Sequence, residues 1–355
     1  MTREADRGAG PEVAVVGSAN VDLVVRVPHR PRGGETLLGG ELLRLPGGKG
    51  ANQAVAAARC GARVEFVACL GEDAEGAFLL DALSGSGVGI AGALTGARPT
   101  GTAIIMLTPD GENAIVVSPG ANAELDVEGA ERASGAWEPA RVVVLSLEIP
   151  LDTVAHVAAR ASAAGARVVV NAAPPAALDR ATLAVCDPLI VNEHEARALL
   201  GGVDGAAGAD GAAGAGSAGA AGARDAAGDD PAALAVRLLE SGAASVVVTL
   251  GAAGSVVAEA GSTLAGGSVQ DGAMRGDAAA GGAVRIPAPR VPVMDTTGAG
   301  DAFVGAVACE LARGARLIEA VRFATAAASL SVQRLGAQAS YAERAEIDAA
   351  LRAEI

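Results

Sequence analysis

The fold class is decided by one stretch, residues 142–171, which reads VVVLSLEIPLDTVAHVAARASAAGARVVVN. Two mainly apolar runs, Val142–Leu147 and Arg167–Asn171, flank an Ala-rich segment, Leu151–Ala164, which ends at Gly165. Apolar runs of this length are typical of buried strands, and a glycine directly after an Ala-rich segment is typical of a helix end. The stretch therefore predicts a strand–helix–strand unit of a parallel sheet.

The same alternation continues on both sides of this unit. Further apolar runs predict strands at Val13–Val16, Val64–Leu70, Pro188–Val191 and Ser245–Leu250. Ala- and Leu-rich segments predict helices at Gly50–Arg59, Asp73–Leu83, Glu193–Leu200, Pro231–Glu240, Ala299–Arg313, Leu317–Gln333 and Arg344–Arg352. Strands that alternate with helices predict an α/β fold, with a mostly parallel central sheet covered by helices on both faces.

Two segments, at about 21–45 and 100–117, do not fit that sheet. Their apolar and polar residues alternate, and the turn Pro109-Asp110-Gly111 marks a hairpin in the second segment. They predict a small separate β-sheet that forms a discontinuous lid. Four apolar residues are candidates for one face of this lid: Leu37, Leu42, Ile104 and Met106.

The rest of the chain predicts a single domain, residues 11–355, preceded by a disordered N-terminus, residues 1–10. Residues 201–228 and 261–282 consist largely of Gly and Ala with scattered Asp. Such segments bury too little apolar surface to offset the entropy of ordering them. We therefore expect two flexible insertions that carry no chemistry.

The composition argues against several classes of partner. The net charge of −14 disfavours binding to nucleic acid or to an anionic membrane. No uninterrupted apolar run reaches the length of a membrane span, and Met1–Gly10 lacks the apolar core of a signal peptide. The four cysteines form no CxxC pair, which argues against a zinc site and favours buried thiols in a reducing cytoplasm.

A glycine-rich segment, Gly47-Gly48-Lys49-Gly50-Ala51-Asn52-Gln53, contains the only lysine among 27 basic residues. Paired glycines allow a ligand to approach the backbone, and Lys49 and Asn52 offer a charge and an amide at a helix start. Lys49 is either a chance survivor in an Arg-rich chain or a position that needs a compact charge. The segment itself is either part of a binding site or a plain turn into a helix.

A second polar segment, Ser18-Ala19-Asn20-Val21-Asp22, directly follows the first predicted strand. Open α/β sheets bind ligands beyond the carboxyl ends of their strands. Asn20 and Asp22 lie two residues apart, so they face the same way on an extended segment. An amide and a carboxylate together suit a polyol, whose hydroxyls both donate and accept hydrogen bonds.

The third segment, Asp295-Thr-Thr-Gly-Ala-Gly-Asp301, leads into an apolar helix. Its glycines permit a sharp turn, and the N–H groups at the helix start provide an anion hole for a phosphoryl group. Asp301 is either a general base beside that hole or a simple helix cap. The spacings of a P-loop and of a GxGxxG motif are both absent, which disfavours a dinucleotide dehydrogenase.

In their order along the chain, 18–22, 47–53 and 295–301, the three segments resemble those of the ribokinase-like carbohydrate kinase family. Further matching segments are Leu147-Glu148, Asn171–Pro174, Asn192–Glu195, Thr249–Gly251 and Gly336–Ser340. The resemblance extends from Val13 to Leu351 apart from the two insertions. It implies an ATP-dependent sugar kinase with Asp301 as the base and Gly298, Ala299 and Gly300 as the anion hole.

The resemblance also implies the remaining sites. Residues that would hold the sugar are Asn20, Asp22, Gly48, Lys49, Gly50, Asn52 and Glu148. Residues that would lie along ATP are Asn192, Thr249, Leu250, Gly251, Gly254, Gly300 and Thr325. Asn192 and Glu195 would position Mg²⁺, mainly through water. The loops that would enclose an activating K⁺, many through backbone carbonyls, contain Asp295, Thr297, Ser331, Arg334, Gly336 and Ser340.

Two positions depart from the family pattern or vary within it. Thr325 stands where the family often has His or Asn near the adenine, which leaves the base contacts open. The residue type at Ser331 is variable, which has no effect if only its carbonyl is used.

The sugar-site match favours phosphorylation of D-ribose at O5, and the resemblance also implies a homodimer formed through the lid. Kinases of the same fold act on deoxyribose, other pentoses, ketohexoses or nucleosides such as adenosine. The 2% aromatic content offers little wall for a nucleoside base. A non-catalytic sugar sensor is the alternative outside the enzymes, although it would be expected to lack Asp301 or the glycines before it.

Overall fold

The computed structural model describes residues 10–109, 113–206, 230–261, 277–278 and 282–353. Residues 1–9 and most of the two predicted insertions lie outside the described residues. At the edges of the insertions, helix α7 (Glu193–Ala206) continues beyond Gly201, and the short strand β13 (Asp277–Ala278) falls within 261–282.

Ten of the described strands form the main sheet, in the order β13-β14-β12-β11-β10-β9-β8-β1-β4-β5. Besides β13, these are β1 (Val13–Val16), β4 (Val64–Gly71), β5 (Val88–Gly96), β8 (Val142–Ser146), β9 (Arg167–Asn171), β10 (Cys186–Asn192), β11 (Ser245–Thr249), β12 (Ser255–Glu259) and β14 (Val284–Ile286). All neighbours from β5 to β11 are parallel, and the pairs from β11 outward to β13 are antiparallel. The predicted mostly parallel sheet is confirmed.

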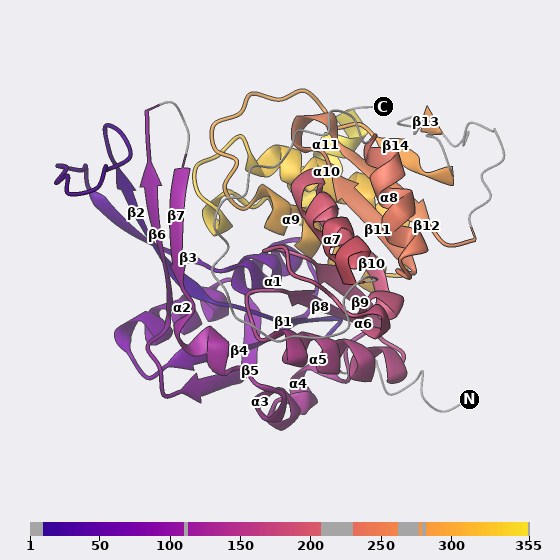
Figure 1. Cartoon of the computed structure of the whole chain (residues 1–355), viewed down its shortest axis with the longest axis horizontal. Coiled ribbons are helices and arrows are strands. Elements are labelled where there is room, and N and C mark those ends of the chain that lie inside the picture. The colour runs from indigo at the N-terminus through magenta and orange to yellow at the C-terminus, as the bar shows by residue number, and fades with distance from the viewer. Residues whose placement is uncertain (1–9, 110–112, 207–229, 262–276, 279–281, 354–355) are drawn as a thin grey trace.

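Helices cover both faces of this sheet (Figure 1). One face carries α1 (Lys49–Arg59), α2 (Ala74–Gly85), α9 (Ala299–Ala312), α10 (Leu317–Ser331) and α11 (Arg344–Ala353). The other face carries α3 (Val127–Arg132), α4 (Ser134–Trp137), α5 (Leu151–Ala163), α6 (Arg180–Val185), α7 and α8 (Pro231–Glu240). Val13 and Val15 of β1 pack toward the first layer, and Ala14 and Val16 toward the second. Burial on both faces explains why the strands are apolar throughout.

The direction of the chain across the sheet changes at β1. From β1 the chain passes outward to β4 and β5, and it later returns to β8 on the opposite side of β1. Connections that leave neighbouring strands in opposite directions keep the carboxyl ends of those strands uncovered, and open α/β proteins bind their ligands there. The carboxyl ends of β1 and β8 therefore mark the expected site.

A second sheet of four strands, in the order β3-β2-β6-β7, stands apart from the main body and forms the predicted lid (Figure 1). Its strands are β2 (Asn20–Arg26), β3 (Leu42–Gly47), β6 (Gly101–Leu107) and β7 (Asn113–Ser118). The β2–β6 pair is parallel, whereas β2–β3 and β6–β7 are antiparallel. Within the predicted lid segment at about 21–45, the second strand begins only at Leu42.

Helix α1 is held between β1 and α9 at contacts that leave no room for a side chain. A Cβ atom on Gly17, at the end of β1, would lie 2.9 Å from the Cα atom of Gly50. A Cβ atom on Gly305 of α9 would lie 2.5 Å from the carbonyl oxygen of Gln53. Since real Cβ atoms do not approach other atoms so closely, glycine at these positions fixes the location of α1.

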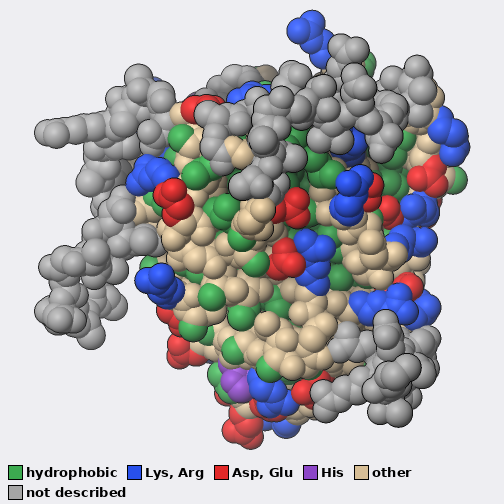
Figure 2. All heavy atoms as spheres, turned by 90° about the vertical axis from the view of Figure 1, so that its right-hand side faces the viewer, with side chains coloured by type: hydrophobic (Ala, Val, Ile, Leu, Met, Phe, Trp, Pro, Cys, Tyr) green, Lys and Arg blue, Asp and Glu red, His purple; other side chains and the backbone are tan. Residues whose placement is uncertain are grey.

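The surface carries both signs of charge. On the face shown in Figure 2, the described Arg side chains are interspersed with Asp and Glu rather than gathered in a patch. No helix among the described residues is long and apolar enough to span a membrane.

Candidate active site

The carboxylate of Asp301 is buried in the first turn of α9 and is held by two side-chain amides of α1. Asn52 Nδ2 donates to Asp301 Oδ2 and Gln53 Nε2 donates to Asp301 Oδ1, each at 3.0 Å. The residue in the N-cap position of α9 is Gly298, not Asp301. The interpretation of Asp301 as a simple helix cap is therefore wrong, because its oxygens face a helix that lies 248 and 249 residues away in the sequence.

Two further amides extend this network. Gln53 Nε2 also donates to Asn171 Oδ1 at 3.0 Å, and Asn171 Nδ2 donates to the carbonyl of Ile190 at 3.2 Å. Gln338 Nε2 donates to Asn52 Oδ1 at 3.0 Å. Each amide that contacts Asp301 is thus itself oriented by a neighbour, which fixes the position of the carboxylate.

Burial raises the pKa of Asp301 above its ordinary value, and the charge of Glu148 adds to this effect. The Lys49 ammonium and the two amides of α1 oppose it without cancelling it. For Lys49 the balance is reversed: burial lowers its pKa, but the surrounding carboxylates raise it by more, with Asp301 first among them. The site thus pairs one buried cation with a carboxylate that has become a better proton acceptor.

Glu148 follows β8 and bridges to the start of α1. Its Oε2 accepts a hydrogen bond from Ser18 Oγ at 2.6 Å and one from the backbone N–H of Lys49 at 3.2 Å. Gly48, in the N-cap position of α1, has a φ of 89°. Its absent side chain matters as well, because a Cβ atom would lie 2.7 Å from the backbone nitrogen of Asn20. The glycines therefore bring Lys49, Glu148 and Asn20 to one edge of the sheet.

Asn20 and Asp22 lie two residues apart on β2, as predicted. Asn20 Oδ1 accepts a hydrogen bond at 2.8 Å from Asn122, which lies in the short 3₁₀ helix Gly120–Glu124. Asn122 Oδ1 in turn accepts the backbone N–H of Ala19 at 2.9 Å. Asn122 is 1% exposed, and its hydrogen bond fixes the orientation of the Asn20 amide. The sequence did not indicate this role.

The carboxylate of Asp22 has a strongly raised pKa. Burial, followed by the charges of Glu148 and Asp301, raises its pKa to about 7. A Cβ atom on Gly47 would lie 2.2 Å from Asp22 Oδ2, so glycine at this position leaves the space that the carboxylate occupies. Near neutral pH, Asp22 is thus present in both its protonated and ionised forms.

The predicted anion hole lies at the start of α9, in a segment that we call the anion loop, residues 295–300. Gly298 adopts a left-handed conformation with φ of 74°, which favours glycine. The N–H of Ala299 already donates to the carbonyl of Thr296 at 3.2 Å. A Cβ atom on Gly300 would meet nothing within 4 Å, so the space above this residue is open.

The carboxylate of Asp295 ties the anion loop to a second loop near the C-terminus. Asp295 Oδ1 accepts hydrogen bonds from Thr297 N and Oγ1 at 2.9 and 2.7 Å, and Oδ2 accepts the N–H of Gly336 at 2.8 Å. Burial raises the pKa of Asp295, but these hydrogen bonds outweigh burial and hold the pKa below its usual value. The carboxylate is therefore ionised at neutral pH.

The other residues predicted around K⁺ use their side chains locally. Ser331 Oγ donates to the carbonyl of Ala328 and Ser340 Oγ to that of Ala337, each at 2.8 Å. Arg334 forms an ion pair with Glu346. Their side chains are thus engaged within the protein, and the use of their carbonyls by K⁺ stays a prediction.

Asn192 and Glu195 form a reciprocal pair at the start of α7. The N–H of Asn192 donates to Glu195 Oε2 and the N–H of Glu195 donates to Asn192 Oδ1, both at 2.8 Å. Burial raises the pKa of Glu195, and the charge of Lys49 acts in the opposite direction. The charge of each of Lys49 and Glu195 shifts the pKa of the other, so the start of α7 acts electrostatically on the same site as α1.

The segment predicted to lie along ATP follows β11. Thr249 Oγ1 donates to the carbonyl of Val191 at 3.3 Å, and Leu250 N donates to the carbonyl of Gly254 at 2.8 Å across the 3₁₀ turn Gly251–Ala253. Thr325 in α10 is buried, and its hydroxyl donates to the carbonyl of Val321 at 2.8 Å. Its proton is therefore committed to its own helix, so the hydroxyl can only accept a hydrogen bond from a ligand.

The chain matches known proteins over nearly its full length. Residues 11–344 match the model of the pfkB family of carbohydrate kinases. A ribokinase of Bacillus subtilis is 35% identical over 338 residues, which cover 95% of this chain and 98% of that protein. A ribokinase of Schizosaccharomyces pombe is 32% identical over 344 residues, which cover 95% of this chain and 96% of that protein.

Solved structures give the same result. A ribokinase from Thermotoga maritima superposes with a TM-score of 0.78 at 32% identity and covers 96% of this chain and 99% of its own. The Arabidopsis thaliana ribokinase complexed with ribose and ATP superposes with a TM-score of 0.76 at 30% identity, covering 97% and 99%. Fold, site geometry and sequence agree, and the chain belongs to the pfkB family of carbohydrate kinases.

Proposed function

We propose that this enzyme transfers the γ-phosphoryl group of ATP to O5 of D-ribose and releases ribose 5-phosphate and ADP. The observation that carries this proposal is the buried carboxylate of Asp301, held by Asn52 and Gln53 beside the start of α9. The ribokinases of B. subtilis and S. pombe and the Arabidopsis complex with ribose and ATP support the choice of ribose.

Asp301 acts as the general base in this proposal. It takes the proton of the attacking hydroxyl while O5 forms a bond to the γ-phosphorus, and the bond from that phosphorus to the β–γ bridging oxygen breaks. The raised pKa of Asp301 brings its proton affinity closer to that needed at neutral pH. The N–H groups at the start of α9 and the partial positive charge of that helix stabilise the transferring group.

The sugar-binding residues would surround the substrate with both donors and acceptors. Asn20 and Asp22 come from β2, Lys49 and Asn52 from α1, and Glu148 from the segment after β8. A site of amides and carboxylates discriminates strongly against an analogue that lacks one hydroxyl, since the unpaired group remains buried. Deoxyribose should therefore be a poorer substrate than ribose.

Magnesium would be held by Asn192 and Glu195 mainly through water. The described residues contain no group of three or more His, Cys, Asp or Glu that could hold a metal by themselves. One oxygen of each side chain is engaged by the backbone, which suits an ion that keeps several of its waters. When bound, Mg²⁺ neutralises charge on the ATP phosphates.

A potassium ion would fit between the two loops that Asp295 connects. The ionised carboxylate supplies negative charge and accepts the N–H of Gly336, while Ser331 ends α10 and Ser340 ends the 3₁₀ turn Gln338–Ser340, on either side of that glycine in the chain. When bound, the cation adds positive potential beside the anion loop. Turnover should be higher in potassium than in sodium or a bulky organic cation, and an Asp295→Asn variant should lose most of that difference.

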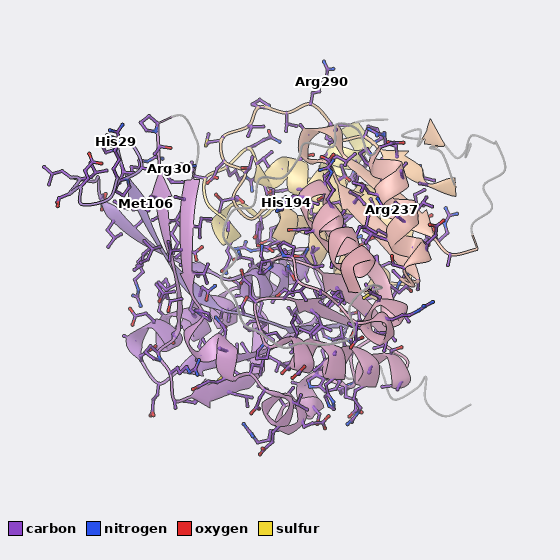
Figure 3. All side chains as sticks on the ribbon, viewed as in Figure 1. His29, Arg30, Met106, His194, Arg237 and Arg290 are labelled. Carbon is purple, nitrogen blue, oxygen red and sulfur yellow. The ribbon has the colours of Figure 1, made fainter. Side chains whose placement is uncertain are left out.

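The lid supports the proposal of a homodimer. By strand register, Leu42, Ile104 and Met106 share one face of the lid, and Asp22 lies on the opposite face. Met106 lies in the outer part of the lid, near His29 and Arg30 (Figure 3). Since the sugar would occupy the face of Asp22, a second copy would cover the other face around a twofold axis.

The four cysteines bear on the compartment. All of them are buried and unpaired. Free thiols throughout a chain are typical of a reducing environment, which supports the proposal of a cytoplasmic enzyme.

A coupled assay of ATP consumption across ribose, deoxyribose, fructose and adenosine tests the proposed function. Ribose should give the highest kcat/KM, and the product should carry the phosphate on O5 by NMR. Equal or better turnover of another acceptor would reassign the substrate. Sugar binding without any ATP consumption would favour the sensor alternative.

A further inference from the structure

The chain contains a single tyrosine, Tyr341, and its hydroxyl lies against the anion loop. The residue follows the 3₁₀ turn Gln338–Ser340 and precedes α11. Tyr341 Oη donates a hydrogen bond to the carbonyl oxygen of Gly298 at 3.2 Å, and the side chain is 4% exposed. The side chain has no role in the transfer reaction proposed above.

The anion loop has a shape that accommodates this hydroxyl. A Cβ atom on Gly298 would lie 2.6 Å from Tyr341 Oη and 2.7 Å from the Cβ atom of Ala337. Any other residue at position 298 would displace the tyrosine or the loop that carries it. Two independent features, the hydrogen bond and this fit, therefore join Tyr341 to the N-cap of α9.

The hydroxyl can act only as a proton donor to that carbonyl. Burial raises the pKa of Tyr341 well above its usual range, and the charges of Asp301 and Asp22 raise it further. The phenol thus stays protonated at any pH at which the enzyme works. Both carboxylates thus act on the phenol electrostatically.

Holding the Gly298 carbonyl has a direct effect on the anion loop. Because the peptide unit is planar, the direction of this C=O fixes the direction of the N–H of Ala299, which donates to the carbonyl of Thr296 at 3.2 Å and so closes the turn that leads into α9. The same carbonyl accepts the N–H of Ala302 at 2.8 Å and so forms the first hydrogen bond of α9. A donor on this carbonyl also polarises the peptide and strengthens its N–H as a donor.

We propose that Tyr341 is a positioning residue for phosphoryl transfer: its hydroxyl holds the Gly298 peptide so that the N–H groups at the start of α9 point at the transferring phosphoryl group. This inference rests on the proposed role of the anion loop. Gln338, three residues before Tyr341, contacts Asn52, so one short segment orients both a proposed sugar-binding amide and the anion loop.

Replacement of the tyrosine by phenylalanine tests the role of the hydroxyl alone. Tyr341→Phe should lower kcat by about threefold to tenfold and leave KM for ribose and for ATP unchanged, since one neutral hydrogen bond is lost. The effect stays modest because 3.2 Å is long for a hydroxyl donor in the absence of substrates. Thr153→Val is the matched control, because Thr153 Oγ1 donates to a backbone carbonyl, that of Leu125, on the other helical layer. That variant should retain wild-type kcat.

A transition-state analogue separates positioning from a purely structural role. In the presence of ribose and ADP, the Kd of aluminium fluoride for Tyr341→Phe should rise by the same factor by which kcat falls. The Kd of ADP alone should not change. A structural role would instead lower the melting temperature and affect both ligands equally.

The single tyrosine also allows direct observation. Growth on 3-fluorotyrosine places fluorine at Tyr341 alone, and the labelled enzyme should give one ¹⁹F resonance. That resonance should shift when aluminium fluoride is added to the enzyme with ADP and ribose, and much less when ADP is added alone. This measurement uses the native hydroxyl and stays informative if Tyr341→Phe folds poorly.

Three outcomes would overturn the inference. One is a kcat of Tyr341→Phe equal to that of wild type, and another is a rise in ribose KM with kcat unchanged, which would make the hydroxyl a sugar ligand. The third is a ¹⁹F resonance that ignores aluminium fluoride. The wild-type enzyme is assayed first, because failure to phosphorylate any sugar would remove the proposed function, whereas these outcomes remove only the role of Tyr341.

Discussion

The two sheets of the molecule bury their apolar side chains to very different extents. Every residue of β1 and of β8 is buried. In the lid, by contrast, Leu42 and Val116 are each 60% exposed and Ile115 is 51% exposed. The main sheet is complete within one chain, whereas the lid presents apolar surface on both faces that only a ligand or another chain can cover.

This difference separates two tasks. The carboxyl edge of the main sheet, together with α1 and α9, holds the groups that would perform the transfer. The lid contributes Asn20 and Asp22 from its first strand and, in the proposed function, would cover the sugar. Substitutions near α1 and α9 should therefore change turnover, whereas substitutions on the outer lid should change assembly.

The largest effect is expected at the centre of the main site. Asp301→Asn should reduce kcat by roughly 10² to 10⁴ and keep the fold, because the amide cannot accept the proton of the sugar hydroxyl. Steady-state kinetics and circular dichroism measure the two properties. A variant within about tenfold of wild type would mean that another group takes the proton.

A smaller loss is expected one step away, at Gln53. Gln53→Met keeps the side-chain length but removes the donor to Asp301 Oδ1, which should lower kcat/KM at pH 7 by about tenfold. The Gln53 amide lowers the pKa of Asp301, so its loss should move the acid limb of the pH–rate profile to higher pH. Gln338→Met, which loses only the contact to Asn52, should cause a smaller change.

The pH dependence of sugar binding should come from Asp22, near the start of strand β2. With the pKa of Asp22 at about 7, the ionised fraction falls about tenfold between pH 8 and pH 6, and ribose KM should rise by about that factor. The stability of the enzyme without sugar should change in the opposite direction with pH. Because the pKa of Asp22 is raised by folding, the folded state binds the proton more tightly than the unfolded state. The contribution of Asp22 to the free energy of unfolding should therefore fall as the pH rises from about 4 through 7. Asp22→Asn should bind ribose weakly and with little dependence on pH, and an unaltered KM profile in that variant would exclude Asp22 as the source.

The smallest effect on turnover is expected on the outer lid. The double substitution Leu42→Glu with Ile104→Glu should yield a monomer by light scattering and change kcat by no more than about twofold. Leu151→Glu, an exposed apolar position on α5, is the control and should leave the mass unchanged. A dimer that survives the double substitution would place the interface elsewhere.

Local patterns sufficed for much of the fold. Mainly apolar runs identified β1, β8 and β9, and glycine or acidic residues identified the ends of α1, α5 and α9. The sequence did not indicate β5, β12 or β14. β5, Val88–Gly96, has glycines among its apolar residues, and β14 is only three residues long, so neither has the apolar pattern of a buried strand. β5 is defined as a strand by its pairing with β4, and β14 by its pairing with β12.

The candidate site divides in the same way. Residues within glycine-rich motifs were recognised, among them Lys49, Asn52 and Asp301. The residues that orient the site were given no role, because Asn122 contacts Asn20, Gln53 contacts Asp301 and Tyr341 contacts Gly298 across separations of 102, 248 and 43 residues respectively. A local pattern contains no record of such partners. Only the packing of α1 on α9 and of the C-terminal loop on the anion loop brings them together.

The glycine contacts that fix α1 limit how such an enzyme can diverge. A change at one binding side chain removes one group, whereas an added methyl at Gly17 or Gly305 would push the whole helix and displace Lys49, Asn52 and Gln53 together. The three side chains of this helix should therefore be retained or lost together. New acceptor preferences are more accessible through β2 and the lid, where side chains can be exchanged one at a time while the machinery of transfer stays intact.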